Sequence, residues 1–190
     1  MLRPGPQLAS LTAMTITPDT KNWTWVLERP CPECGFASAE VAREDVASLL
    51  RENALAWVTV LASPADPAVR PDPTTWSPLE YACHVRDCNR VYDERVRLML
   101  TEDDPAYPNW DQDETAVAEK YGEQDPARVA VELAESAEAL AARFESVPSD
   151  AWERTGRRSD GSGFTIDSLA RYFIHDPVHH LWDVTGNPAA

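Results

Sequence analysis

Four long stretches of the sequence carry apolar side chains at the spacing of one face of an α-helix. No stretch shows the alternation that predicts a strand, and no segment repeats another. Helices of this kind bury their apolar faces by packing side by side. The sequence therefore predicts an all-α protein, a four-helix bundle with long connections. The expected helices cover 38–62, 77–100, 125–147 and 165–185.

Capping residues mark where three of these helices should begin. Ser77 is a good N-cap, because Pro78 follows at the first helical position and Glu80 stands where a capping box needs it. Asp125 and Thr165 are expected to cap the third and fourth helices, since both residue types accept hydrogen bonds from free backbone N–H groups. The bundle is thus predicted from local signals as well as from its apolar stripes.

The composition restricts what such a bundle binds. With 17 Lys and Arg against 32 Asp and Glu, the net charge is −15, and such a surface repels nucleic acids and anionic membranes. No apolar run is long enough to span a membrane, and four cysteines are too few for a disulfide scaffold, which favours a reducing cytoplasm. Residues 22–190 are expected to form one domain after a flexible extension at 1–21. The oligomeric state stays open, a homodimer included.

Three of the four histidines lie in the last predicted helix. His175 and His179 are one turn apart on one face, so their imidazoles could share a metal ion. A Glu directly after the first histidine would indicate a zincin protease, but Asp176 stands there. The pair could also be an ordinary buried one, yet apolar neighbours make unpaired imidazoles costly, which favours a ligand. His84 is the one histidine outside this helix, and His180, offset by about 100°, is expected to form hydrogen bonds instead.

Two segments together resemble a known family. Trp76-Ser-Pro-Leu-Glu-Tyr-Ala-Cys-His-Val-Arg-Asp87 and the later His175-x-x-x-His179 are similar to the histidine motif of the DinB-like superfamily. That group includes the N-terminal domain of mycothiol-dependent maleylpyruvate isomerase and the bacillithiol S-transferases. The resemblance covers residues 23–186 and implies a four-helix bundle with a divalent metal between its helices, zinc or else nickel or another transition metal. By position the implied ligands are His84, His175 and His179, although Pro177 departs from the commoner pattern.

Three neutral histidines would leave such an ion with an open position. Two reactions then fit: hydrolysis by an acidified bound water, or transfer of a low-molecular-weight thiol activated as its thiolate. The expected substrate is a small molecule. Asp183, one turn after His179, is the best candidate for a catalytic base or for a residue that supports the ligands. Asp87 and Asp176 are expected to be solvated carboxylates on helix surfaces.

An open metal position also needs a pocket. Trp76, Trp110, Tyr172 and Trp182 could form its walls, although each could equally be a core residue. The acidic connection at 101–124 is long for a bundle, and long connections commonly form lids or binding loops. We therefore expect this connection, with a short helix inside it, to border the metal site.

The segment Cys31-Pro-Glu-Cys34-Gly35 is typical of a zinc knuckle, because the two-residue gap and the glycine turn both sulfurs toward one point. A knuckle needs two further ligands, but Cys83 and Cys88 would point about 140° apart on a helix. A reversible Cys31–Cys34 disulfide is the rival interpretation, and thiols without a role are a third. These cysteines support an alternative function, that of a non-catalytic metal-binding or redox-responsive protein.

Overall fold

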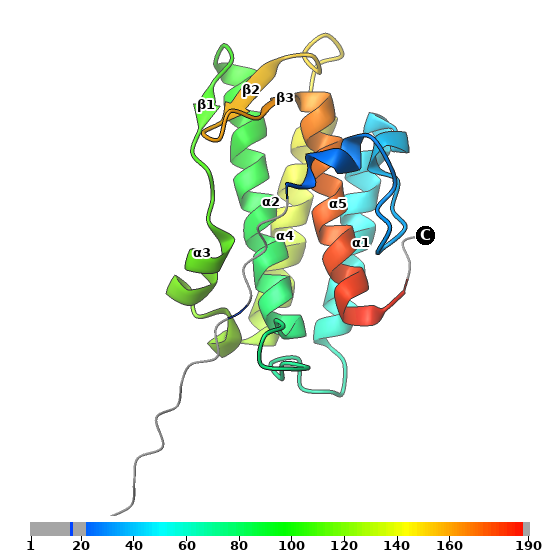
Figure 1. Cartoon of the computed structure of the whole chain (residues 1–190), viewed down its shortest axis with the longest axis vertical. Coiled ribbons are helices and arrows are strands. Elements are labelled where there is room, and N and C mark those ends of the chain that lie inside the picture. The colour runs from blue at the N-terminus through cyan, green and yellow to red at the C-terminus, as the bar shows by residue number, and fades with distance from the viewer. Residues whose placement is uncertain (1–15, 17–21, 188–190) are drawn as a thin grey trace, which may run out of the picture.

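In the computed structural model, which describes Ile16 and residues 22–187, four long helices pack side by side along the longest axis (Figure 1). The predicted all-α four-helix bundle is confirmed. The closest packing joins the third long helix to the first two, and the last helix covers the same two from the other side. None of the described helices is long and apolar enough to span a membrane. The long helices are α1 (Val46–Leu61), α2 (Pro78–Thr101), α4 (Pro126–Glu145) and α5 (Ile166–Thr185).

The predicted caps position three of the long helices. Ser77 Oγ accepts a hydrogen bond from the Glu80 N–H, and the Glu80 carboxylate accepts one from the Ser77 N–H, which completes the capping box of α2. Asp125 caps α4 through the N–H of Ala127, and Thr165 caps α5. Each helix therefore begins where the sequence places it. The extension predicted for residues 1–21 lies outside the described residues, apart from Ile16.

A small sheet lies at one end of the bundle, where no strand was expected. Its order is β1 (Ala106–Tyr107), β2 (Thr155–Arg158) and β3 (Gly163–Thr165), with β1 parallel and β3 antiparallel to β2. The strands are too short for alternation to predict them, and β1 pairs with a segment about fifty residues away. Gly156 is required here, because a Cβ would lie 2.7 Å from the Met99 side chain. The sheet fixes the start of the long connection between α2 and α4.

The segment before α1 also differs from the prediction. The expected helix at 38–62 begins only at Val46, and three short 3-10 helices precede it. This N-terminal segment, residues 22–45, runs along α5, and all three 3-10 helices contact that helix (Figure 1). It therefore brings residues from the start of the domain onto its last helix. The 3-10 helices are η1 (Trp23–Leu27), η2 (Ser38–Glu40) and η3 (Arg43–Asp45).

The long connection between α2 and α4 returns along the bundle. It holds α3 (Gln112–Ala118), close to the short helix expected there, and the turn η4 (Tyr121–Glu123). In Figure 1 the chain passes from the sheet at one end of the bundle to α3 beside α2. Trp110, just before α3, is thereby held against the N-terminal half of α2, over His84.

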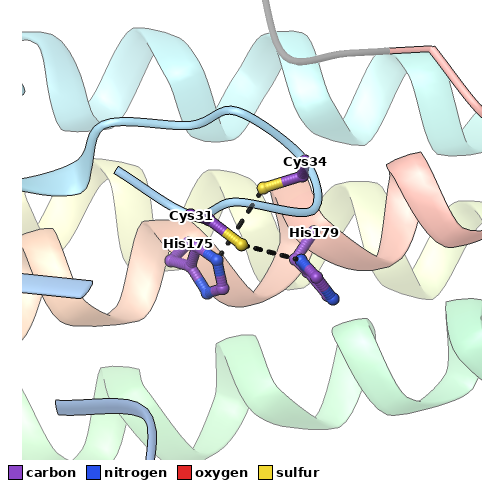
Figure 2. A group of neighbouring side chains, drawn as sticks. All are labelled: Cys31, Cys34, His175 and His179. Atoms are coloured by element: carbon purple, nitrogen blue, oxygen red, sulfur yellow. Dashed lines mark hydrogen bonds between the residues drawn. The ribbon is translucent and has the colours of Figure 1, made fainter. Parts of the chain in front are cut away.

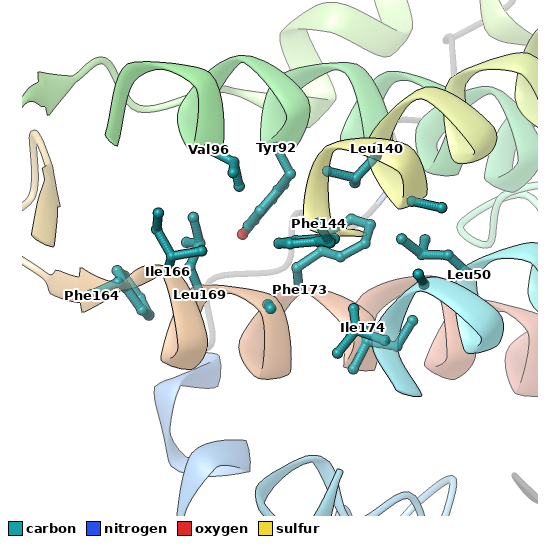
Figure 3. Packing of buried hydrophobic residues seen from close by; sticks show 14 of the residues in the cluster. Leu50, Tyr92, Val96, Leu140, Phe144, Phe164, Ile166, Leu169, Phe173 and Ile174 are labelled. Atoms are coloured by element: carbon teal, nitrogen blue, oxygen red, sulfur yellow. The ribbon is translucent and has the colours of Figure 1, made fainter. Parts of the chain in front are cut away.

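The buried core fixes the rotation of α5. Figure 3 shows side chains from all four long helices meeting between them, with Leu169, Phe173 and Ile174 supplied by α5. Burial of each side chain of this size contributes about 1.5–3 kcal/mol to the free energy of folding. Rotating α5 about its axis would lose this free energy. Pro177 lies inside the continuous helix, and the Asn53 amide of α1 donates a hydrogen bond to its carbonyl oxygen at 2.9 Å. This packing therefore also determines which neighbouring elements the residues of α5 after Ile174 face.

Candidate metal centres and the pocket between them

Two pairs of residues on α5 have side chains that can ligate a metal ion. The two members of each pair are one helical turn apart, and the second pair is offset from the first by one residue. His175 and His179 form the first pair, and Asp176 and His180 form the second. One residue turns a helix by about 100°, so the two pairs face different neighbours. The first faces the N-terminal segment and the second faces α2.

The first pair meets the cysteines of the knuckle (Figure 2). The Sγ atom of Cys31 lies 3.7 Å from Nδ1 of His179, and Sγ of Cys34 lies 3.8 Å from Nε2 of His175. One ligand atom from each of the four residues lies within 4.8 Å of every other. All four residues are buried, none of them more than 6% exposed. We call this set the Cys2His2 group.

The loop that carries the two cysteines is a tight turn closed by its own backbone. Gly35 N–H donates to the Cys31 carbonyl and Cys31 N–H donates to the Phe36 carbonyl, both at 2.9 Å. Gly35 has a φ of 79°, in the left-handed region that favours glycine. Cys31 and Cys34 therefore lie close together, as their spacing predicts, and both are free thiols.

Burial favours the uncharged forms of Cys34, His175 and His179. It raises the pKa of the Cys34 thiol to about 11, and it lowers the pKa of His175 to about 4, with His179 adding to the second effect. Burial also lowers the pKa of His179. Neutral imidazoles have the free lone pair that a metal needs, whereas each thiol must release its proton on binding.

The second pair meets His84 of α2. Nε2 of His84 lies 3.1 Å from Oδ1 of Asp176, and Nε2 of His180 lies 3.7 Å from Oδ2 of the same carboxylate. The opposite nitrogen of His180, Nδ1, lies 2.9 Å from Oδ2 of Asp183. Burial opposes the ionisation of Asp176, but the electrostatic influence of the neighbouring His84 and His180 imidazoles, together with the hydrogen bond to His84, outweighs it and holds the pKa of Asp176 below its usual range. We call His84, Asp176 and His180 the His2Asp group.

The His2Asp group lies in the wall of a pocket of about 610 Å³. Trp76, Trp110 and Tyr172 line it, as predicted, and so do residues 109–113 of the long connection. Trp110 stacks on His84, with ring centroids 5.4 Å apart and planes only 14° from parallel. Trp182 does not line this pocket; it packs beside His179 and borders a separate apolar groove. The pocket is therefore aromatic around the His2Asp group.

A buried cation also lines this pocket. Arg95 of α2 is only 5% exposed, and its guanidinium lies 4.9 Å from the ring centroid of Tyr92 and 5.0 Å from that of Tyr107. No carboxylate of the described chain forms an ion pair with it. Arg158, the other arginine of the pocket, is paired with Asp160. Arg95 therefore brings to the pocket wall a positive charge that has no direct carboxylate partner, although carboxylates such as Asp176 and Asp183 line the same pocket.

The structure divides the three predicted ligands between the two groups. His84 lies with Asp176 and His180, whereas His175 and His179 lie with the cysteines, so the three predicted ligands form no single group in the described chain. The core packing of α5 is the physical reason, because it turns residues 176 and 180, and not 175 and 179, toward α2.

Two residues of the His2Asp group were underrated from sequence. Asp176 was expected to be a solvated carboxylate, and His180 was expected only to form hydrogen bonds. Asp176 and His180 have the same one-turn spacing as the histidine pair, and this signal could have found them. Likewise, the missing partners of the knuckle were sought among the cysteines although two histidines were available.

Asp183 and Cys88 lie at the pocket, and Asp87 lies on α2 one turn from His84. Asp183 contacts both groups, since its Oδ1 lies 3.7 Å from Nε2 of His179 while its Oδ2 faces His180. Cys88 lines the pocket, but burial raises the pKa of its thiol far above the usual value, with Asp176 adding to the effect. Asp87 was expected to be solvated; it is instead mostly buried and paired with Arg86 at 2.9 Å.

Comparisons with known proteins agree with this architecture. The structure resembles that of YfiT from Bacillus subtilis, described as a probable metal-dependent hydrolase with an unusual four-helix bundle topology. The TM-score is 0.61 and the identity 18%, with 90% of this chain and 91% of that chain covered, so the likeness concerns the fold. No curated protein matches the chain. The sequence model of the DinB superfamily matches residues 47–184, and the chain therefore belongs to the DinB superfamily.

Proposed function

We propose that the chain is a metal-dependent enzyme that acts on an anionic small molecule, with a catalytic divalent ion held by His84, Asp176 and His180. The observation that carries this proposal is the incomplete ligand set. Only three side chains of the described residues converge at the His2Asp group, and they do so in the wall of a pocket. Catalytic metal sites keep a position open for water or substrate in this way, whereas structural sites are closed by four ligands.

The residues present fit a metal of the zinc class. Bonds of about 2.0–2.2 Å place neighbouring ligand atoms about 3–3.5 Å apart. The Nε2 atom of His84 lies 3.1 and 3.4 Å from the two oxygens of Asp176, and Nε2 of His180 lies 3.7 Å from Oδ2 of Asp176. One ligand atom from each of the three residues lies within 4.8 Å of the others. Two imidazoles and one carboxylate suit zinc, and also nickel or iron. When bound, such an ion would act as a Lewis acid toward a water, a thiol or a carbonyl group.

The surrounding residues prepare this group for a metal. Asp183 accepts the Nδ1 proton of His180, so the lone pair at Nε2 points to Asp176 and the pocket. Asp176 is held as a carboxylate, the form that binds metals. Trp110 covers one face of His84 and limits the access of water from the long connection. Asp183 is thus a positioning residue, and its place in the pocket wall also makes it the candidate base predicted from sequence.

Arg95 supports an anionic substrate. A guanidinium buried without a carboxylate partner is costly unless a ligand supplies the negative charge. Its position in the same pocket would let it bind a substrate carboxylate while the reacting group faces the His2Asp group. The protein as a whole is strongly acidic, so this local positive charge would also select the site at which an anion binds.

Hydrolysis is the reaction that we favour, and transfer of a low-molecular-weight thiol is the second candidate. The description of YfiT as a probable metal-dependent hydrolase supports the first. Members of the resembled family that use thiols support the second. Both reactions need an open position on the metal ion. They differ in the second reactant, which is water in hydrolysis and a thiol in the transfer.

The proposal is tested with simple esters. Metal-depleted protein is reloaded with zinc or nickel, and turnover of mono-4-nitrophenyl succinate is compared with that of neutral 4-nitrophenyl acetate, with and without an added thiol such as cysteine. We expect metal-dependent turnover that prefers the anionic ester; a rate proportional to thiol would identify the transferase. Metal-loaded protein that turns over neither ester nor thiol would favour the alternative, a non-catalytic metal-binding protein.

A further inference from the structure

We propose that Cys31, Cys34, His175 and His179 hold a structural zinc ion, distinct from the catalytic ion of the His2Asp group. Two thiolates and two imidazoles are the ligand set of closed tetrahedral zinc sites. With four protein ligands the ion has no free position, so this site binds no substrate. Binding converts each of the two thiols to a thiolate and releases one proton from each, while both imidazoles bind in their neutral form.

The distances between ligand atoms match a tetrahedral ion. Zinc–sulfur bonds of about 2.3 Å and zinc–nitrogen bonds of about 2.0–2.1 Å, at the tetrahedral angle, separate sulfur from nitrogen by about 3.6 Å. The two measured separations, Cys31 to His179 and Cys34 to His175, are 3.7 and 3.8 Å. Hydrogen bonds alone do not explain why both sulfurs and both imidazoles converge on one point, because each would be satisfied by a single partner.

The environment of His179 also fits a metal ligand. Its Nδ1 atom faces Cys31, while its Nε2 atom faces Oε2 of Glu33 at 3.4 Å and Oδ1 of Asp183 at 3.7 Å. Metal-bound histidines commonly donate their second N–H to a carboxylate, which fixes the ring and raises its basicity. Trp23 covers both histidines, with ring centroids 5.2 Å from His175 and 5.1 Å from His179.

The zinc would fasten the N-terminal segment, residues 22–45, to α5. This segment lacks a long helix of its own and reaches α5 through η1, η2 and the knuckle between them. Trp23 and Glu33, which it carries, also line the pocket beside the His2Asp group. The structural ion would thus hold one wall of the proposed active site without touching the substrate.

Metal content and X-ray absorption test the proposal on the full chain, purified in the presence of reductant. We expect two equivalents of zinc per chain and an absorption spectrum that contains a zinc–sulfur shell near 2.3 Å. Cys34→Ser should lose one equivalent together with the sulfur shell, whereas Cys34→His should keep the ion because imidazole can replace the thiolate. Cys83→Ala is the matched control, since Cys83 is also buried but belongs to neither group, and it should keep both ions.

Other outcomes would overturn the proposal. One is a spectrum of the unaltered chain with bound zinc but no sulfur shell, a measurement that holds even if Cys34→Ser fails to fold. Another is a Cys31–Cys34 disulfide that forms readily in zinc-containing buffer, which would make the pair a redox element instead. Loss of the catalytic equivalent alone, through Asp176→Asn, should leave the sulfur shell intact; if that shell disappears as well, the two ions are not distinct.

Discussion

The two neighbouring faces of α5 each carry a pair of potential metal ligands one turn apart, but the two pairs meet different partners. The face with His175 and His179 meets two buried thiols, which makes four candidate ligands, and we call it the closed face. The face with Asp176 and His180 meets one histidine, which makes three, and we call it the open face. Side chains of both faces line the same pocket. Both pairs have the same spacing along the helix, so spacing alone does not decide their roles. What differs is the segment that covers each face: a cysteine turn on one side, and a single histidine surrounded by aromatic rings on the other. In the proposed assignment, the partner segment sets the number of protein ligands at each face.

The largest effect should come from breaking the open face. Replacing His180 or Asp176 by Ala should lower the metal-dependent rate about 10³-fold, because a Lewis acid contributes several kcal/mol and 1.36 kcal/mol is a factor of ten. Steady-state rates at saturating metal measure this. His179→Ala should lower the rate much less while it reduces zinc content. Equal losses in the two variants would mean that the faces are not functionally separate.

The next effect should come from breaking the closed face. Structural zinc contributes about 10–16 kcal/mol to the folding of small zinc-finger peptides. This bundle has a core of its own, so for Cys34→Ser we expect a fall in Tm of about 10 °C, or about 3–5 kcal/mol at this chain length. Thermal unfolding by circular dichroism measures it. Asp176→Asn, on the open face, should change Tm by far less; a larger fall there would reverse the roles of the two faces.

Asp183 sharpens the comparison because it contacts both faces. Its carboxylate lies 2.9 Å from Nδ1 of His180 and 3.7 Å from Nε2 of His179. Loss of such a partner typically costs 10–100-fold in metal affinity or activity. For Asp183→Ala we expect a loss of about that size, stronger at the open site, where the contact is shorter. Competition with a coloured chelator resolves the two affinities, and Asp183→Asn should recover part of the loss.

Arg95 tests the pocket and leaves both ligand groups intact. For Arg95→Met we expect about a 10–100-fold fall in kcat/KM for the anionic ester, since hydrogen bonds to charged groups contribute about 1.5–3 kcal/mol. The neutral ester should be nearly unaffected. Both metal equivalents should also remain. If the two esters lose equally, Arg95 supports the fold and does not bind the substrate anion.

The smallest effect concerns acid stability away from either face. Burial opposes the ionisation of Asp87, but hydrogen bonds from Arg86 and Tyr121 outweigh it and lower its pKa. Because the folded pKa lies below the unfolded value of about 3.9, this stabilisation is present above pH 4 and is lost as the pH falls through the folded pKa. Asp87→Asn should therefore cost about 1–3 kcal/mol at pH 7 and lose that difference in acid. Denaturant unfolding of metal-free protein at several pH values measures this.

The long helices could be predicted from sequence because their signals are local. Ser77, Asp125 and Thr165 cap the helices that they were expected to cap, and each cap depends on residues within one turn. The β-sheet could not be predicted, because two-residue pairing between Ala106–Tyr107 and a distant strand leaves no local pattern. The helix expected from residue 38 was too long, because residues 38–45 pack on other elements as 3-10 turns.

The ligand sets depended on a quantity that the sequence does not contain, the rotation of α5 about its axis. A turn of about 100° decides whether residue 175 or 176 faces α2. Packing of Phe173 and Ile174 against the other helices determines that rotation. Resemblance to the family pointed to the two helices on which both groups lie, but which pair of α5 residues faces His84 became clear only from the packed core.

The closed face joins parts of the chain that are far apart in sequence. Its two sulfur–nitrogen contacts connect residues separated by 148 and 141 positions. Such contacts are entropically expensive to form early, so they arise after more local helix pairs have docked. During synthesis, Cys31 and Cys34 would leave the ribosome long before the α5 histidines, and two thiols alone hold zinc weakly. Stable zinc uptake would therefore report that the nascent chain has completed its bundle.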